Sequence, residues 1–159
     1  MRTVTWCVLA GLSTVQAAPA AFHTAVQSLA LPVRHVAADR YVTAGTVRIQ
    51  YDPSTPGILV SNVSVPLGSR GVAVAAALVP AWCGPNLPPL PAGHLSGQME
   101  RSERLNRAVE SGQATSSLVR SRAGHCEIQT LSNSLESFVL LKRVPGASVW
   151  PPTPFQENP

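Results

Sequence analysis

The side chains best suited to chemistry in this chain are four histidines and three cysteines: His23, His35, His94, His125, Cys7, Cys83 and Cys126. His125 directly precedes Cys126, and neighbouring side chains of a strand point to opposite faces. That placement makes it difficult for the pair to bind one metal or to act as base and nucleophile. Neither a CxxC nor an HxxxH spacing supports a metal centre. We therefore expect no metal, no cofactor and no catalytic residue.

The acidic residues lead to the same expectation. Asp39 and Asp52 are the only aspartates, and three of the glutamates cluster in one charged helical segment. Paired carboxylates of the kind that hydrolyse glycosides are therefore not evident. The chain also has no glycine-rich phosphate-binding loop. We predict that the protein is not an enzyme.

The N-terminal segment, residues 1–17, is typical of a secretory signal peptide. Arg2 supplies a positive charge, and Thr3 to Val15 form an uncharged, mostly apolar stretch. Small residues at positions 15 and 17 predict cleavage between Ala17 and Ala18. Two alternatives are an ordinary apolar first strand or helix, and an uncleaved membrane anchor through residues 3–17. We expect a secreted, extracellular protein, and we expect no stable membrane span unless that segment stays as an anchor.

Secretion predicts two covalent features of the mature chain. Cys7 would leave with the signal peptide, and an oxidising compartment would then favour a disulfide between Cys83 and Cys126. The alternative is two buried free thiols. Asn62-Val63-Ser64 is an N-glycosylation sequon, so Asn62 is a candidate glycan site in a eukaryotic secretory pathway.

Composition limits the class of protein. The 159 residues suggest one domain, or one domain plus tails, and 45% hydrophobic residues are enough to build a core. Only 5% are aromatic and 13% charged, with a net charge of +4. Eleven of the twelve basic residues are arginine, which fits either bidentate anion contacts or GC-rich coding. This composition is typical neither of a highly charged disordered chain nor of a membrane protein.

Hydrophobic patterning predicts the elements that would position these residues. In the stretch 41–51, Val47, Ile49 and Tyr51 alternate with polar residues, which favours a half-buried strand. The apolar run 72–79 fits a buried central strand, although its alanines leave a helix possible. The further expected segments are an Ala-rich arm or short helix at 18–40, a strand at 58–65, a Pro-rich linker at 80–93, a helix at 97–112, strands within 126–144 and a disordered tail at 146–159.

Together these segments predict a β-rich domain over residues 41–145. The expected fold class is mainly β, a small antiparallel sheet or sandwich-like arrangement with one exposed helix. The alternative is a partly disordered chain with no settled fold.

The expected function is that of a secreted, non-catalytic binding or interaction module for an extracellular protein or surface ligand. We expect no nucleic-acid partner, because the arginines of the segment 97–112 alternate with glutamates. The alternative is the product of an open reading frame without a defined biochemical activity. A cooperative thermal transition would separate the two hypotheses.

Overall fold

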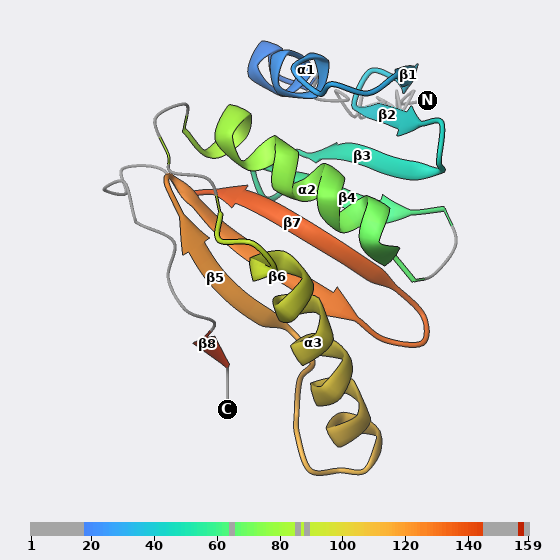
Figure 1. Cartoon of the computed structure of the whole chain (residues 1–159), viewed down its shortest axis with the longest axis vertical. Coiled ribbons are helices and arrows are strands. Elements are labelled where there is room, and N and C mark those ends of the chain that lie inside the picture. The colour runs from blue at the N-terminus through green and yellow to red at the C-terminus, as the bar shows by residue number, and fades with distance from the viewer. Residues whose placement is uncertain (1–17, 64–65, 85–86, 88–89, 145–155, 158–159) are drawn as a thin grey trace, which may run out of the picture.

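The computed structural model describes residues 18–63, 66–84, 87, 90–144 and 156–157 (Figure 1). The expected signal peptide, Ser64 of the sequon and most of the expected tail lie outside the described residues.

An antiparallel sheet forms the centre of the protein. Its strands are β1 Val33–Ala37, β2 Arg40–Thr43, β3 Val47–Asp52, β4 Gly57–Asn62, β5 Val119–Ala123, β6 Cys126–Ser132 and β7 Ser137–Arg143. They lie in the order β1-β2-β3-β4-β7-β6-β5, and the two-residue strand β8 (Gln156–Glu157) pairs with β5. Each neighbouring pair is antiparallel.

Three helices cover one face of this sheet: α1 Ala20–Gln27, α2 Gly68–Cys83 and α3 His94–Glu110. α2 lies across β4 and β7, and α3 lies across β5 and β6 (Figure 1). α1 packs beside α2 at the end of the sheet that holds β1 and β2.

The chain builds the sheet in two halves. Strands β1 to β4 form a meander, the chain then passes through α2 and α3, and β5 to β7 return from the opposite edge. The halves join where β4 pairs with β7, with Val60 opposite Val139 and Ile58 opposite Leu141. All four of these side chains are fully buried, so the join lies in the core.

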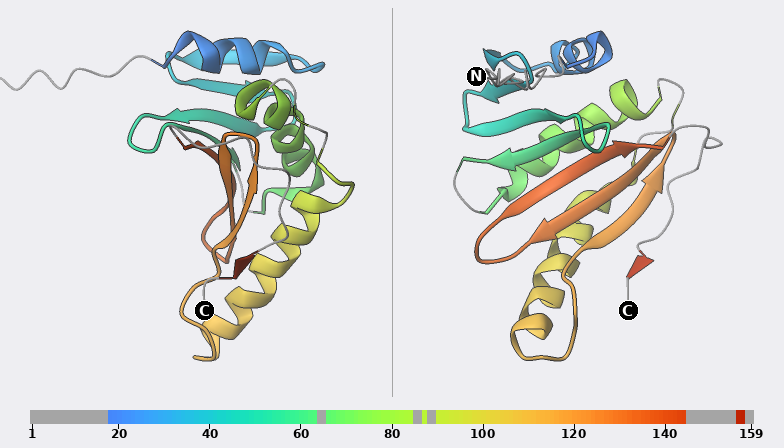
Figure 2. Two further views of the ribbon diagram at one scale, coloured as in Figure 1. Left: turned by 90° about the vertical axis from the view of Figure 1, so that its left-hand side faces the viewer. Right: turned by 180° about the vertical axis from the view of Figure 1, so that it is seen from behind.

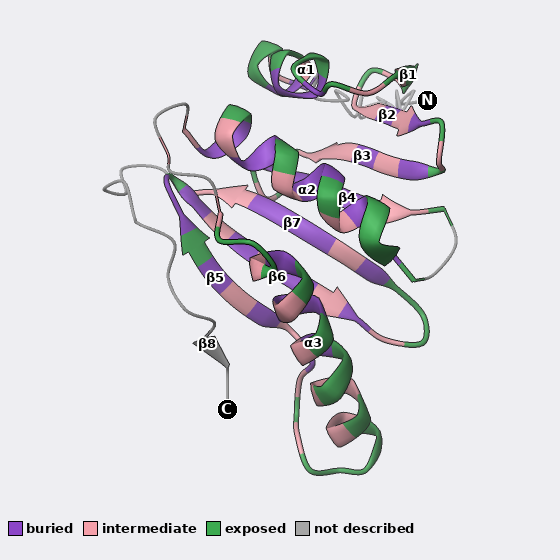
Figure 3. Cartoon of the chain, viewed as in Figure 1, coloured by how far each residue is buried: buried purple, intermediate pink, exposed green. Residues whose placement is uncertain are grey.

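Alternation along the strands divides buried side chains from solvated ones (Figure 3). Val47 and Ile49 of β3 face the helices and are buried, while Arg48 and Gln50 point to the other face and are half-buried. This is the alternation that the stretch 41–51 predicts. The stretch nevertheless forms two strands, because Thr46, at φ 68°, turns the chain between β2 and β3.

The expected fold class is wrong in its proportions. The fold is mixed α/β, with three helices and a seven-stranded antiparallel sheet, rather than mainly β with one helix. An antiparallel sheet is confirmed. Within the described residues the chain has a defined tertiary structure, which differs from the alternative of a chain with no settled fold.

The run 72–79 is the clearest correction, because it is helical rather than a central strand. It belongs to α2, whose buried residues recur at helical spacing: Gly71, Val74, Ala75, Leu78, Val79, Trp82 and Cys83. An apolar run of eight residues fits a buried strand and a buried helix equally well by periodicity. Alanine, the best helix former, and the continuation of the apolar pattern to residue 83 favour the helix.

The Pro-rich linker expected at 80–93 begins later than predicted. Pro80 lies within the last turn of α2, where its missing N–H removes one backbone hydrogen bond near the end of the helix. The indole Nε1 of Trp82 donates to the Leu141 carbonyl oxygen at 2.9 Å, which fixes this turn on the sheet. The contact between Trp82 and Leu141 therefore stabilises the last turn of α2, although Pro80 by itself disfavours a helix there.

The helix expected at 97–112 is present as α3, three residues longer at its start. It is not simply exposed, because Leu95, Gln98, Met99 and Ser102 form a buried stripe against β5 and β6. Gly112, at φ +75°, follows the helix and ends it, as expected of a C-terminal glycine.

The arm expected at 18–40 contains two elements, α1 and β1. Strand β5 was not expected, because its outward residues Arg120 and Arg122 make the segment look like a polar loop. Its inward residues are Val119, Ser121 and Ala123, all buried. The pattern alternates, but a serine in the middle of the buried side weakens the signal.

Candidate binding surface

Cys83 and Cys126 form a disulfide, as the sequence predicts. Their Cα atoms lie 5.3 Å apart, and both residues are completely buried. The bond joins the last residue of α2 to the first residue of β6. Neither sulfur is therefore available as a thiolate nucleophile or as a metal ligand.

His125 lies next to this disulfide but points elsewhere. It occupies the turn between β5 and β6 and is exposed, while Cys126 is buried. Its backbone N–H donates to the Cys83 carbonyl oxygen at 2.9 Å. The two side chains are therefore divided between solvent and core.

His94, the first residue of α3, and Ser121 of β5 form a histidine–serine pair that the sequence did not suggest. His94 Nε2 is 3.1 Å from the hydroxyl oxygen of Ser121, and that hydroxyl donates to Gln98 Oε1 at 2.9 Å. Burial lowers the pKa of His94 from its ordinary value, so the neutral ring is favoured. Ser121 is only 2% exposed, which keeps substrates from its oxygen. This pair fixes α3 on β5, and its geometry does not provide an accessible nucleophile.

Gln98 extends the same network to the backbone of two strands. Its Nε2 donates to the carbonyl oxygens of Val119 and Ile128, at 3.1 and 3.2 Å. One turn further on, the Ser102 hydroxyl donates to the Ser117 carbonyl oxygen and accepts from the backbone N–H of Ser132. Satisfied hydrogen bonds of this kind allow polar groups to be buried in the interface between a helix and a sheet.

His23 and His35 meet at the opposite end of the sheet. Their ring centroids lie 6.0 Å apart, and His23 Nδ1 is 2.8 Å from the Tyr41 hydroxyl oxygen. Within the described residues, no three histidine, cysteine or acidic side chains gather in a way that could hold a metal ion. In the same part of the chain, none of the helices has the length and apolar character needed to cross a bilayer.

Asn62, the candidate glycan site, is half-buried at the end of β4. Its Nδ2 donates to the Pro66 carbonyl oxygen at 3.1 Å, and its Oδ1 accepts from the hydroxyl of Thr46. Val63, the middle residue of the sequon, is 58% exposed. The expected signal cleavage between Ala17 and Ala18 falls at the boundary of the described residues, where Ala18 already packs on the core.

Comparison with protein-family models, with curated proteins and with solved structures finds no match for this chain.

The face of the sheet opposite the helices has no structural role in the contacts described so far. No described helix or strand lies over it, as the view from behind shows (Figure 2, right). We call it the open face. Strand register arranges its side chains in rows, one of which runs Arg40, Gln50, Leu59, Leu140, Gln129 and Arg120. A second row runs Arg34, Val42, Arg48, Ser61, Phe138 and Leu131.

Four large apolar side chains form the centre of the open face. Leu59 lies opposite Leu140 across β4 and β7, and Phe138 lies opposite Leu131 across β7 and β6. Leu140 is 8% exposed, and the other three are half-buried. Register places the four next to one another, so they form one continuous apolar cluster.

Basic side chains surround this cluster on both sides. Six project from the open face: Arg34, Arg40, Arg48, Arg120, Arg122 and Lys142. Three acidic residues lie at the same face: Asp52, Glu127, and Asp39, whose Oδ2 accepts from Gln50 Nε2 at 3.2 Å. Glu127 lies 3.9 Å from Arg120 Nε. Within the described residues, Arg34, Arg48 and Lys142 form no ion pair. The open face therefore has an apolar centre and a net positive border.

Proposed function

We propose that this protein is a secreted, non-catalytic binding module that holds an acidic segment of a partner protein on its open face. The observation that carries the proposal is the apolar cluster bordered by six basic residues. An antiparallel sheet commonly leaves one face to water, and its solvated side chains are then mostly polar. A cluster of leucines and a phenylalanine at the centre of such a face is more typical of an interaction surface.

The chemistry of the open face favours an acidic protein segment over a nucleic acid. Unpaired bases bind by stacking on aromatic side chains, and Phe138 is the one aromatic residue of the central cluster. Leu59, Leu131 and Leu140 instead fit aliphatic side chains. A segment that alternates leucine with glutamate would place its apolar side chains on the cluster and its carboxylates near the arginines.

A short peptide that alternates leucine with glutamate is a direct probe of this proposal. We expect measurable binding by fluorescence anisotropy, weakening as salt is added, and much weaker binding of a leucine–lysine peptide of equal length. The double variant Arg48→Gln/Arg122→Gln should lose at least about tenfold in affinity, because charge-assisted contacts are removed from both sides of the cluster.

The matched control is Arg104→Gln/Arg107→Gln, which removes the same charge from exposed positions of α3. It should bind the acidic peptide as the unaltered protein does. Equal losses in the two double variants would reduce the effect to net charge and overturn the proposal. Binding of single-stranded RNA or of anionic vesicles, without binding of the acidic peptide, would overturn it in favour of that class of partner.

A further inference from the structure

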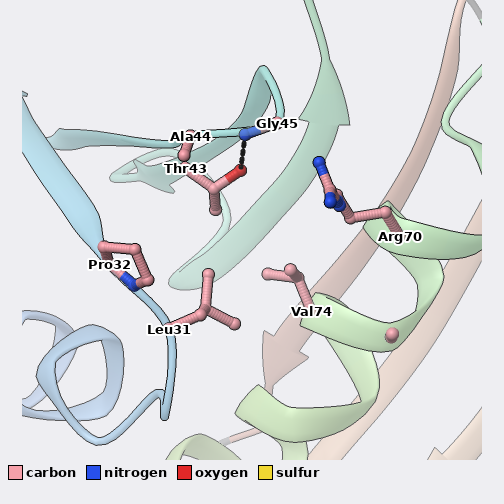
Figure 4. Close-up of a pocket in the computed structure, with 8 residues that line it drawn as sticks. Leu31, Pro32, Thr43, Ala44, Gly45, Arg70 and Val74 are labelled. Atoms are coloured by element: carbon pink, nitrogen blue, oxygen red, sulfur yellow. Dashed lines mark hydrogen bonds between the residues drawn. The ribbon is translucent and has the colours of Figure 1, made fainter.

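A cavity on the helical side of the protein lies between the first half of α2, the end of β2 and the segment that joins α1 to β1 (Figure 4). Its volume is about 340 Å³, at the lower end of the range of small-molecule sites. The residues that shape it include Leu31, Pro32, Thr43, Gly45, Arg70 and Val74. It is separate from the open face, so its ligand does not depend on the proposed function.

The cavity is polar at one end. Arg70 extends from the first turn of α2, and its guanidinium points to the end of the cavity formed by Thr43 and Gly45 (Figure 4). Within the described residues, no carboxylate pairs with Arg70. A guanidinium at the edge of a cavity, with no carboxylate partner among the described residues, provides hydrogen-bond donors and a positive charge for an anionic ligand.

Thr43 contributes a second donor at the same end. Thr43 is only 5% exposed, and its hydroxyl oxygen accepts from the backbone N–H groups of Gly45 and Val47, both at 3.3 Å. No acceptor among the described residues takes its hydroxyl proton. A buried hydroxyl normally finds an acceptor, so this proton is suited to a ligand oxygen.

The remaining walls of the cavity are aliphatic. Leu31 and Val74 face one another across it, and Pro32 closes one side (Figure 4). None of the lining residues is aromatic, so the walls offer no ring for stacking. They suit an alkyl chain, whose burial is favourable in proportion to the apolar area removed from water.

We infer that this cavity binds a carboxylate that carries a short aliphatic tail. The carboxylate oxygens accept hydrogen bonds from the Arg70 guanidinium and the Thr43 hydroxyl, and the tail lies between Leu31 and Val74. Two sources share this chemistry: a free aliphatic monocarboxylic acid, and the C-terminal carboxylate of a peptide that ends in an aliphatic residue.

Titration of the full mature chain with hexanoate, followed by ¹⁵N–¹H NMR, tests the assignment. We expect saturable shifts of the Leu31, Gly45 and Val74 amide signals. Hexanol keeps the tail without the charge, and acetate keeps the charge without most of the tail, so both should bind at least about tenfold more weakly. An N-acetylated Ala-Leu peptide with a free carboxylate, compared with its C-terminal amide, tests the peptide source.

Two variants act on the proposed carboxylate contact. Arg70→Gln removes the charge at an exposed position, and it should weaken binding at least about tenfold, whereas Arg70→Lys should retain part of the affinity. Gly45→Ala tests the same contact with Arg70 left in place, because a Cβ at residue 45 would lie 2.0 Å from Arg70 Nη1 and must displace the guanidinium. Arg104→Gln, on the exposed surface of α3, is the control and should leave binding unchanged.

The outcomes separate the two sources and can overturn the assignment. Binding of hexanoate alone, with loss in Arg70→Gln, supports a free acid. Binding of the peptide acid, but not of its amide, supports a chain terminus. The assignment is overturned if hexanol binds as tightly as hexanoate, if Arg70→Gln and Gly45→Ala retain full affinity, or if no probe shifts the three amides.

Discussion

Arg143 of β7 lies over the ring of Trp82 of α2, with its guanidinium carbon 3.8 Å from the centre of the indole ring. The same side chain donates a hydrogen bond from Nε to the Trp82 carbonyl oxygen at 2.9 Å. One arginine therefore contacts both the ring and the backbone of a single residue. Because Trp82 immediately precedes the disulfide cysteine Cys83, this contact fixes the end of α2 where the helix layer is linked to the sheet.

Replacing this arginine by lysine should destabilise the protein although the charge is retained. Lysine has neither the planar group that stacks on Trp82 nor the Nε–H that reaches its carbonyl oxygen. We expect Arg143→Lys to lower the free energy of unfolding by about 1–2 kcal/mol in urea denaturation. Arg104→Lys, at an exposed position of α3, is the control and should stay within about 0.5 kcal/mol. Equal stability of the two variants would contradict a structural role for the contact.

Removal of the disulfide should have a larger effect. The bond closes a loop with a sequence separation of 43 residues, for which the chain-entropy model gives about 4 kcal/mol. We expect the double variant Cys83→Ala/Cys126→Ala to unfold at a clearly lower urea concentration. We also expect no free thiol in a chain that begins at Ala18 and so lacks Cys7, and maleimide should therefore not label that chain when it is denatured without reductant. Labelling of one equivalent per cysteine would refute the second expectation.

Gly124 should tolerate no side chain, because two constraints act on it together. Its φ of +57° disfavours any residue with a Cβ, and a Cβ there would lie 2.5 Å from the Cys83 carbonyl oxygen, a backbone atom. We expect Gly124→Ala to cost more than about 2 kcal/mol in thermal or urea unfolding.

The matched control for this substitution is Gly112→Ala. Gly112 has a φ of +75°, but nothing lies within 4 Å of its added Cβ. It should therefore show the conformational cost alone, about 1–2 kcal/mol. If both alanine variants lose the same stability, close packing of Gly124 against Cys83 is not important.

Stability should fall in mild acid because of His94. Burial lowers the pKa of this histidine in the folded protein below its ordinary value of 6.5. The unfolded chain then takes up a proton near pH 6.5 while the folded protein does not, so the free energy of unfolding decreases as pH falls through that value. The decrease ends once pH is below the folded pKa. His94→Gln should show a shallower decrease in urea titrations just above and below pH 6.5, and an unchanged decrease would rule out His94 as its source.

Export and glycosylation remain predictions that one mass measurement can test. From the medium of secreting eukaryotic cells, we expect a chain that begins at Ala18 and carries a glycan at Asn62. Asn62→Gln should lose the mass that an endoglycosidase removes from the unaltered protein. Recovery of cell-retained protein that still begins with Met1 would reject the signal peptide, and equal masses of the enzyme-treated and untreated protein would reject the glycan.

The sequence by itself determined those features that depend on local pattern or on simple pairing. Alternation placed Val47 and Ile49 on the buried side of a strand, and Gly112 ended a helix where its permissive backbone is needed. Once Cys7 was assigned to the signal peptide, two cysteines were left to pair, and the structure confirms their bond. These inferences succeed because each depends on few residues and on no knowledge of distant neighbours.

Only the tertiary structure decided what covers each surface. The run 72–79 is helical because α2 extends to Cys83, where Trp82 and Arg143 hold its end on β7 beyond a proline that suggested a break. Arg48 and Arg120 are far apart in the sequence, yet strand order places both around one apolar cluster. Arg70 lies beside Gly45 and lines one cavity with Thr43 only because the tertiary fold brings the first turn of α2 close to the end of β2. Surfaces and cavities arise from contacts between distant segments, and periodicity along the chain does not contain that information.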